Sequence, residues 1–484
     1  MLLGFRCRNY RSIRDEQSLS MLAGPTKNLG QHITSIGGFD ILKAALIYGA
    51  NGAGKSNIFK AIRFSSQLII KNKPYYGPHD TFQTLVNSEN EPSLFEYEVE
   101  IKGRFFRYGL EMILKDRKVV GEWLYEFFPE EDDRLIFLRN NKNIVLFEDE
   151  EKPFENINGE LFIHNARRKD FWYGKEGDRL AMHDVQSWFW GSLAVIGPEA
   201  SMLWDLDFGR KDVLDGITDV VSRFDTGITG SDFVRHGVGD EPIDIVKNSR
   251  INNKSSIYKG NHGIFKDDGE NPVLAFRFRH GYKDGEEFYV NLNEESDGTL
   301  RIMKLSPIIF CDEMKTDNYD GDDITYIVDE FDRTLHPAVV YGFIKWFLAK
   351  KYKTHKQLIM TTHTSGLLDQ DLVRRDEIWF TQKDDSGATS LYSLDDYKVR
   401  FDKKIEKAYL EGHFQGMPEV MLPDEEGDDD AIEERPRQEG DTQACQPDHP
   451  CFRRHKDGAQ LFQGHQSLRD RQKLQIEVDI PAER

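Results

Sequence analysis

The chain has 484 residues, of which 38% are hydrophobic and 31% charged, and its formal net charge is −20 at neutral pH. This length allows two or three domains, whereas the lack of an apolar run of about 20 residues argues against a membrane-spanning helix, and four scattered cysteines argue against a disulfide framework. The negative charge disfavours non-specific binding of DNA over the whole surface, and the charged residues directly after residue 5 do not fit a signal peptide, so we expect a cytoplasmic protein without a membrane partner.

The first stretch, residues 2–22, contains two runs in which apolar and polar side chains alternate, which predicts a hairpin. Between the two runs lies Asn9-Tyr10-Arg11-Ser12-Ile13. This segment resembles the N-F-[KR]-S-[IF] segment of the RecF and SMC class of ABC-type ATPases, and the resemblance implies that it packs beside the nucleotide. A surface hairpin with solvated arginines is the alternative.

A phosphate-binding P-loop is predicted at residues 49–56, whose sequence GANGAGKS fits G-x-x-x-x-G-K-[ST]. A short apolar run at residues 44–48 predicts a buried strand before it, and the apolar spacing of residues 57–70 predicts a helix after it. Backbone N–H groups and the helix dipole then face the phosphates, with Lys55 at the β/γ-phosphates and Ser56 as a Mg²⁺ ligand. The residues predicted to bind the nucleotide here are Gly49, Asn51, Gly52, Gly54, Lys55, Ser56 and Asn57.

Residues 94–128 alternate in several short runs joined by polar turns, which predicts an antiparallel meander. ABC-type heads carry such a β-subdomain, and they also carry a Q-loop glutamine, for which Gln83 is the nearest candidate. Residues 159–270 have a mixed pattern, and we expect them to form an inserted, mainly helical lobe.

A second nucleotide-binding segment is suggested by Glu294-Glu295-Ser296-Asp297-Gly298-Thr299, which precedes a predicted helix over residues 300–305. The segment resembles the ABC signature motif, in which S-x-G at a helix start reaches the γ-phosphate bound on a second subunit. The resemblance therefore implies that Ser296 and Gly298 bind nucleotide. A capped helix without a ligand is the alternative.

The apolar run at residues 324–328 predicts a buried parallel strand that ends in Asp329-Glu330. Carboxylates at the carboxyl end of such a strand lie where α/β sheets place their ligands. Asp329 is predicted to hold Mg²⁺ through water, as a Walker B aspartate does, and Glu330 to orient or deprotonate the attacking water. A strand that merely ends in a polar turn is the alternative.

Leu335-His336-Pro337 follows, and it resembles the D-loop region of RecF-like and OLD-like ATPases. A further strand over residues 357–361 delivers His363 to the same edge of the sheet. Its position after Walker B and one helix resembles that of the ABC switch histidine, which contacts the γ-phosphate. We therefore expect a catalytic role for His363 beside those of Glu330 and Lys55.

The order of these motifs is that of an ABC-type ATPase head. P-loop and Walker B lie roughly 270 residues apart without sustained heptads, so the gap is a folded insertion rather than the coiled coil of SMC proteins. The chain most closely resembles the AAA-type ATPase of abortive-infection (AbiL/RloA-like) anti-phage systems. The expected fold class is α/β, a P-loop NTPase with a mixed sheet, an antiparallel β-subdomain, a helical insertion and a disordered acidic C-terminal tail. The expected domains are residues 1–158 and 271–420 as the two halves of the head, 159–270 as the insertion and 421–484 as the tail.

The resemblance implies an enzyme that hydrolyses ATP with Mg²⁺ and forms a homodimer or larger homo-oligomer through ATP held between heads. Because little chain follows His363, no room remains for the nuclease domain of OLD proteins, so the expected partner is a separate effector, a nuclease by the resemblance. The expected function is a sensor-transducer in anti-phage defence. A RecF-like DNA repair ATPase, with DNA as a partner, and an ATP-gated scaffold with slow turnover are the alternatives.

Overall fold

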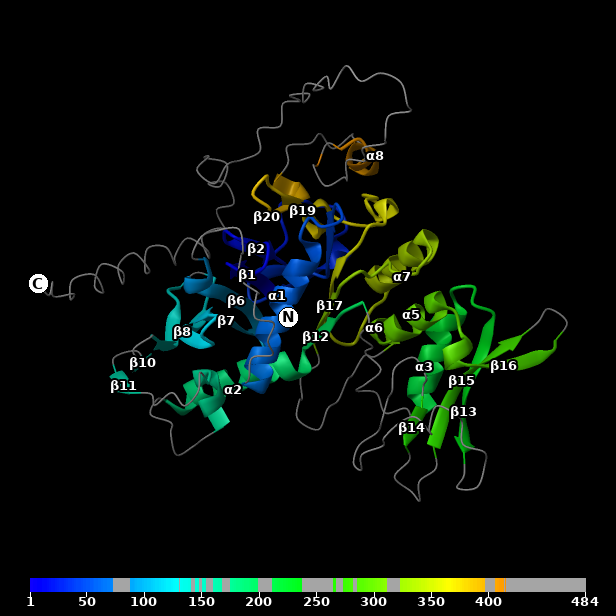
Figure 1. The fold of residues 1–484 in the computed structure, drawn as a ribbon, viewed down its shortest axis with the longest axis horizontal. Helices are drawn as coiled ribbons and strands as arrows, with labels where there is room; N and C mark the ends of the chain where they lie inside the picture. The colour runs from blue at the N-terminus through cyan, green and yellow to red at the C-terminus, as the bar shows by residue number, and fades with distance from the viewer. Residues whose placement is uncertain are drawn as a thin grey trace, which may run out of the picture. The chain divides into compact units, whose positions relative to one another are not determined.

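A computed structural model describes most of the chain up to residue 414 (Figure 1). Among the described residues, no helix is long and apolar enough to cross a membrane. Residues Met1–Pro418 form one compact unit. The predicted acidic tail and Gln83 lie outside the described residues. The described residues are 1–72, 88–129, 131–140, 144–147, 150–153, 160–167, 175–198, 211–236, 264–266, 273–281, 285–310, 323–396, 405–412 and 414.

A six-stranded sheet carries three of the predicted nucleotide-binding segments, because the P-loop, Asp329-Glu330 and His363 each follow one of its strands. Its first five strands run parallel, and the last, β20, runs antiparallel to β19. The parallel strands are rich in apolar residues because both faces of such a sheet are covered. The strand order is β12 (Leu193–Ile196), β17 (Ile324–Val328), β18 (Lys356–Thr361), β5 (Ala44–Gly49), β19 (Ile378–Lys383) and β20 (Thr389–Ser393).

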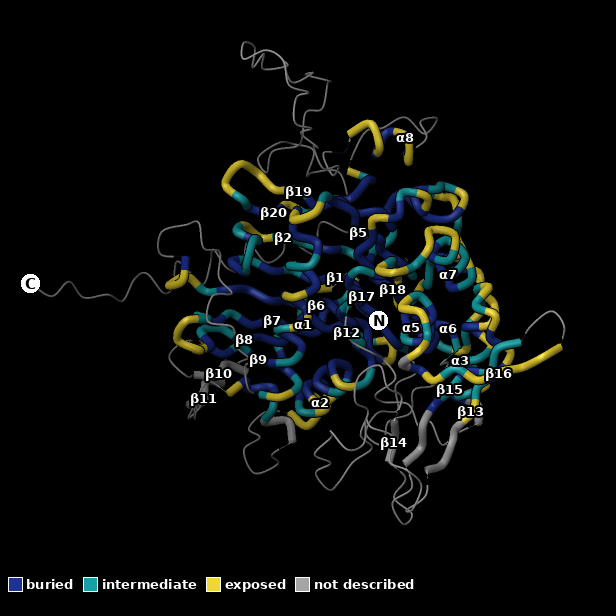
Figure 2. The backbone as a smooth tube through the Cα atoms, turned by 45° about the vertical axis from the view of Figure 1, so that its right-hand side comes forward, coloured by how far each residue is buried: buried dark blue, intermediate teal, exposed yellow. Residues whose placement is uncertain are grey.

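Helices cover both faces of this sheet. Alternate side chains of a strand point to opposite faces, so neighbouring residues of β5 contact different helices. Leu46 of β5 belongs to the core formed with α7 (Pro337–Ala349). Ile47 instead lies with Ile58 of α1 (Lys55–Lys71) around a small apolar cavity. Figure 1 shows α1 and α7 on opposite sides of β17, and Figure 2 shows that the strands between them are buried.

An eight-stranded antiparallel sheet packs on the other side of α1. The Tyr97 hydroxyl of this sheet donates a hydrogen bond to the Ile62 backbone oxygen of α1 at 3.1 Å, so α1 lies between the two sheets. The meander predicted over residues 94–128 is therefore confirmed and extended. The strand order is β11 (Glu150–Pro153), β10 (Ile144–Phe147), β9 (Arg134–Arg139), β8 (Lys118–Phe127), β7 (Arg104–Ile113), β6 (Ser93–Ile101), β1 (Leu2–Arg8) and β2 (Gln17–Ser20).

A four-stranded sheet beside α5 (Asp297–Leu305) contains residues from both sides of the boundary expected at residue 270. The core formed with α3 (Lys211–Ser222) includes Phe276 and Phe278 of its central strand. The strands are β13 (Ile228–His236), β15 (Val273–Gly281), β14 (Ile264–Lys266) and β16 (Glu287–Asn291).

Within residues 159–270, α2 (Glu176–Gly191) packs on α1, and β12 joins the six-stranded sheet. The division of the chain into domains stays a prediction. The remaining described elements are β3 (Ile33–Ile36), β4 (Phe39–Leu42), α6 (Pro307–Phe310), α8 (Ile405–Leu410) and the 3-10 helices η1 (Gly30–His32), η2 (Ser88–Asn90), η3 (Phe162–Arg167), η7 (Leu292–Glu294), η8 (Ser365–Leu367), η9 (Arg375–Glu377) and η10 (Leu394–Asp396).

Candidate functional site

The P-loop connects the carboxyl end of β5 with the first turn of α1, as the sequence predicts. Gly54 has a φ of 108°, and a Cβ atom there would lie 2.1 Å from the Thr389 hydroxyl oxygen. Only glycine fits this position, because the backbone conformation and the close neighbour both exclude a side chain. At Gly52, with a φ of 81°, a Cβ atom would meet nothing within 4 Å, so this part of the loop faces open space. Asn51 is exposed beside it.

Lys55 is buried at the start of α1 and points back into the loop. Its Nζ donates to the backbone oxygens of Gly49 at 2.7 Å and Ala50 at 3.1 Å. Burial lowers the pKa of Lys55 to about 8, although the carboxylates of Asp329, Asp332 and Glu330 oppose this shift. A phosphate at the loop would stabilise the charged ammonium further.

Ser56 and Asp329 meet across the sheet edge. The Ser56 hydroxyl donates to Asp329 Oδ1 at 3.1 Å, and the Thr361 hydroxyl donates to the same oxygen at 2.7 Å. The described residues contain no group of three or more acidic, histidine or cysteine side chains able to hold a metal without further ligands. One hydroxyl and one carboxylate nevertheless fit Mg²⁺, which takes few protein oxygens and completes its shell with water and substrate phosphates.

Glu330 follows Asp329 in a left-handed backbone conformation, with a φ of 47°. Its backbone N–H donates to the Thr361 hydroxyl at 2.7 Å, and its side chain is 44% exposed. Arg333 forms an ion pair with the carboxylate at 3.7 Å. A non-glycine residue in this conformation is held there by its neighbours, and such residues cluster at functional sites.

His363 is positioned by Asp332, a residue that the sequence analysis did not select. Asp332 Oδ2 accepts hydrogen bonds from the His363 backbone N–H at 2.7 Å and from the hydroxyls of Thr362 and Thr364 at 2.8 and 2.9 Å. Burial, and then the positive charge of Lys55, lower the pKa of His363, which keeps its imidazole neutral near pH 7. The Thr-His-Thr sequence after β18, with hydroxyls on both sides of the histidine, is the signal that could have pointed to such an anchor.

The segment around Ser12 lies against the P-loop, as the resemblance implies. Asn57 Nδ2 donates to the Ser12 hydroxyl oxygen at 2.6 Å, and the hydroxyls of Ser12 and Thr389 lie 2.7 Å apart. The Thr389 hydroxyl in turn donates to the Ala53 backbone oxygen at 3.0 Å. Thr389 was missed by the sequence analysis because it lies more than 300 residues from the loop that it supports.

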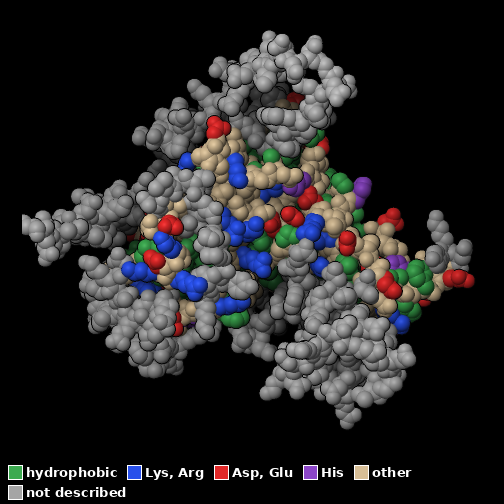
Figure 3. Space-filling model, viewed as in Figure 1, with side chains coloured by type: hydrophobic (Ala, Val, Ile, Leu, Met, Phe, Trp, Pro, Cys, Tyr) green, Lys and Arg blue, Asp and Glu red, His purple; other side chains and the backbone are tan. Residues whose placement is uncertain are grey.

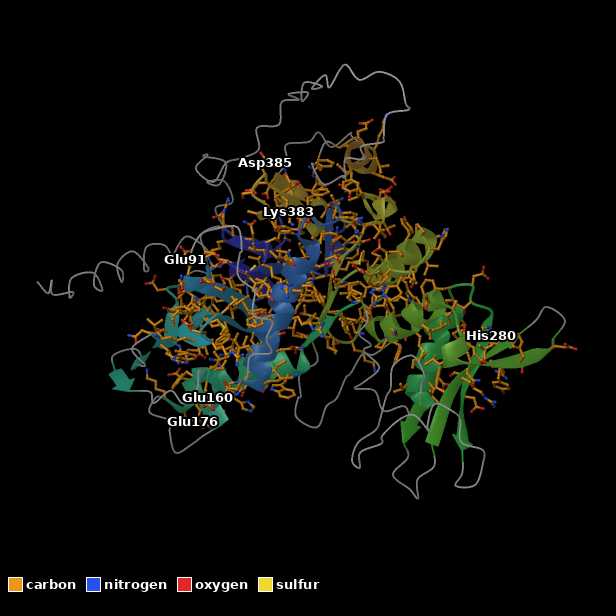
Figure 4. All side chains as sticks on the ribbon, in the orientation of Figure 1. Glu91, Glu160, Glu176, His280, Lys383 and Asp385 are labelled. Atoms are coloured by element: carbon orange, nitrogen blue, oxygen red, sulfur yellow. The ribbon has the colours of Figure 1, made fainter. Side chains whose placement is uncertain are left out.

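Ser296 and Gly298 lie at the N-terminus of α5. The Ser296 hydroxyl oxygen accepts a hydrogen bond from the Thr299 backbone N–H at 3.1 Å and so caps the helix. The residue before Ser296, Glu295, is linked to β15 through His280, which is labelled in Figure 4. Its Nε2 atom lies 2.6 Å from Oε1 of Glu295. Among the hydrogen bonds of the described residues, none joins Ser296 or Gly298 to the P-loop of the same chain.

Positive side chains accompany the site although the chain is acidic. The α1 sequence contains four basic residues and no acidic one, and its Lys60 and Arg63 are exposed. Figure 3 shows Lys and Arg side chains gathered near the centre of the visible face, where Figure 1 draws α1. This local positive potential favours the approach of an anionic ligand.

A protein-family model matches the part of the chain that contains the P-loop and the residues at the sheet edge beside it. A family model described as "AAA domain, putative AbiEii toxin, Type IV TA system" matches residues 44–369, which include β5, the P-loop, Asp329, Glu330 and His363. No curated protein matches the chain.

Solved structures of SMC heads are among those similar to the chain. The SMC head domain from Thermotoga maritima has 12% identity and a TM-score of 0.38, with 82% of this chain and 99% of that chain covered. An SMC head bound to the C-terminal winged-helix domain of ScpA has 11% identity and a TM-score of 0.37, with 84% and 99% covered. An SMC head with an extended coiled coil, bound to the C-terminal domain of ScpA from Pyrococcus furiosus, has 12% identity and a TM-score of 0.35, with 86% and 99% covered.

Proposed function

Because the chain belongs to the family of AAA domains related to AbiEii, with an ABC/SMC-like P-loop head, we propose that it binds ATP with Mg²⁺ and hydrolyses it to ADP and phosphate. One observation supports this proposal above the others. Ser56 and Asp329 are 273 residues apart in the chain, yet their side chains share a hydrogen bond beside Lys55. A structural turn needs no such meeting of a hydroxyl, a carboxylate and a buried ammonium group.

Each residue of the site has a distinct role in the proposed reaction. Backbone N–H groups from Gly49 to Gly54 and the Lys55 ammonium bind the phosphates, whereas Ser56 and Asp329 would hold Mg²⁺. The metal ion, when bound, neutralises charge that develops on the phosphate oxygens. Glu330 accepts a proton from the attacking water, and neutral His363 donates a hydrogen bond to the terminal phosphate. Asp332 keeps the His363 backbone in place.

We propose that a second copy of the chain completes this site. The N-terminus of α5, with exposed Ser296 and with Gly298, is an anion-binding end that makes no hydrogen bond to its own P-loop among the described residues. In a two-fold dimer each α5 N-terminus faces the nucleotide of the partner. ATP then joins the two heads, and hydrolysis separates them.

The resemblance to abortive-infection ATPases and the family match support a role as a cytoplasmic sensor-transducer in anti-phage defence. ATP-driven closure and opening of the heads would control a separate effector, a nuclease by the resemblance. A cell-based test compares phage plaquing on cells that carry the gene with its neighbours and on cells that carry the Glu330→Gln form. Equal plaquing in both would argue against the defence role while leaving the ATPase proposal intact.

Magnesium-dependent hydrolysis is the direct test of the proposed activity. Asp329→Asn is expected to weaken the apparent affinity for Mg²⁺ in ATP turnover by about 10- to 100-fold, because the site loses its carboxylate. Titration of phosphate release against Mg²⁺ measures this effect. Asp385→Asn, at an exposed turn residue between β19 and β20 (Figure 4), is the matched control and should titrate as wild type. Wild-type protein without Mg²⁺-dependent turnover would contradict the proposal.

Nucleotide affinity should depend on alkaline pH through Lys55. Its pKa is about 8 in the free protein, and the phosphates raise it in the complex, so above pH 8 binding requires uptake of a proton. Affinity for ATP is therefore expected to fall by up to about tenfold per pH unit above pH 8 and to be flat below it. Fluorescence titration with a labelled ATP analogue measures this, with exposed Lys60→Met as the control that keeps the dependence. A flat affinity up to about pH 10 would contradict it.

A further inference from the structure

Arg301, on the signature helix α5, reaches the backbone of the Walker B segment. The residue is only 4% exposed. Its guanidinium donates to the backbone oxygens of Glu330 at 2.7 Å, Asp329 at 3.2 Å and Phe331 at 3.4 Å. A fourth hydrogen bond goes to the Pro198 backbone oxygen at 3.4 Å. One side chain therefore holds three consecutive carbonyl groups at the end of β17.

The guanidinium of Arg301 is bound by backbone carbonyl groups. Among the described residues, its hydrogen bonds go to carbonyl groups and none goes to a carboxylate. Burial and the nearby Arg333 lower the pKa of Arg301 to about 10, and the carboxylates of Asp332, Glu330 and Asp329 only partly offset this. A buried guanidinium without a carboxylate partner is costly to keep, so its position calls for a role beyond packing.

The carbonyl that receives the shortest of these bonds belongs to the residue with the strained backbone. Glu330 has a φ of 47°, and its N–H is bound by the Thr361 hydroxyl on its other side. Thr361 on β18 and Arg301 on α5 thus fix both peptide groups of Glu330. The left-handed conformation decides where the Glu330 side chain points. Among the hydrogen bonds of the described residues, none joins Arg301 or Thr361 to residues 49–56 of the P-loop.

We propose that Arg301 is a positioning residue that holds Glu330 in its left-handed conformation and so couples the helix that carries Ser296 to the catalytic carboxylate of the same chain. This inference rests on the proposed ATPase function. Ser296 lies five residues before Arg301, so a phosphate bound at the N-terminus of α5 acts on the helix that holds Glu330. Hydrolysis thereby becomes sensitive to whether the second head is in place.

Two variants test the proposal. Arg301→Met is expected to lower turnover by about 10²-fold, the usual cost of a small misplacement of a catalytic group, while the affinity for ATP stays within about twofold. Arg301→Lys keeps the charge but has one ammonium in place of the planar fork, so an intermediate loss is expected. Lys304→Met removes a positive charge from the same helix and is the matched control, with turnover close to wild type.

A double variant separates positioning from a general structural effect. If Arg301 acts through Glu330, then Arg301→Met should cause no further loss of turnover in a Glu330→Gln background. Fully additive losses, a proportional loss of ATP binding, or wild-type turnover in Arg301→Met would each overturn the proposal. So would loss of the folded state in both Arg301 variants, which would assign the residue to the fold.

Failure of the underlying function would look different. Wild-type protein without ATP turnover would overturn the ATPase assignment itself. Unchanged turnover in Glu330→Gln would leave the ATPase assignment standing but remove Glu330, and with it the proposed role of Arg301, from the mechanism. If Glu330→Gln slows turnover and Arg301→Met does not, the ATPase assignment stands and only the role of Arg301 is lost.

Discussion

Glu330→Gln is expected to lower ATP turnover by about 10²- to 10⁴-fold and to leave the affinity for ATP within about twofold of wild type. Glutamine keeps the size and shape of the side chain but cannot accept the proton of the attacking water. The backbone of Glu330 is fixed by Thr361 and Arg301 through its N–H and carbonyl groups, so the substitution leaves the local geometry intact. We expect binding to be retained because, in the proposed mode, the P-loop holds the phosphates, and the Glu330 carboxylate does not support that loop.

Phosphate release under saturating Mg²⁺ and ATP measures turnover, and calorimetric titration measures binding. The matched control is Glu91→Gln, an exposed glutamate of the antiparallel-sheet region (Figure 4), which should behave as wild type. Wild-type turnover in Glu330→Gln would show that another group activates the water. Equal losses of binding and turnover would show that Glu330 holds the nucleotide instead.

Lys55→Met and Ser296→Arg should each abolish ATP turnover when tested alone. An equimolar mixture of the two variants should recover about a quarter of the wild-type turnover. Lys55→Met removes the ammonium from its own P-loop, and Ser296→Arg places a bulky side chain where the partner's nucleotide lies in the proposed dimer. In a mixture, half of the dimers are mixed, and each mixed dimer pairs one intact P-loop with one intact signature helix. Each mixed dimer therefore has one complete site out of two, so about a quarter of all sites in the mixture are complete.

Turnover of the mixture relative to each variant alone is the measurement. Loss of the α5 cap costs only about 1 kcal/mol, and Ser296→Asp keeps a capping side chain while repelling phosphate, so it should be as inactive as Ser296→Arg. No recovery in the mixture would mean that the two residues do not serve one shared site. Full activity of Ser296→Arg alone would remove α5 from the mechanism.

The parts of the fold that the sequence predicts well are those in which local pattern and motif coincide. The strand and helix around the P-loop were expected at residues 44–48 and 57–70 and lie at Ala44–Gly49 and Lys55–Lys71. The strand before Asp329 and Glu330 lies where its apolar run predicts it, at Ile324–Val328. Both strands are buried on two faces, so their apolar runs leave little choice of structure.

Other elements could not be predicted from local pattern. β12 has only four residues and directly follows α2, so its apolar run reads equally well as the end of that helix. The anchors of the site also escape sequence reasoning, because Arg301, Asp332 and Thr389 act through contacts with residues distant in the chain. Their residue types are common on any surface, and only the folded geometry distinguishes them.

The most direct test of the two-chain site is the molar mass of the Glu330→Gln protein in solution, measured by light scattering with Mg²⁺-ATP and with Mg²⁺-ADP. We predict a dimer with ATP, because in the proposed site the P-loop of one chain and the Ser296 helix of the other hold the terminal phosphate together. We predict a monomer with ADP and with the Glu330→Gln, Ser296→Arg double variant. The same mass in both nucleotides, or an ATP-dependent dimer that survives Ser296→Arg, would contradict this arrangement.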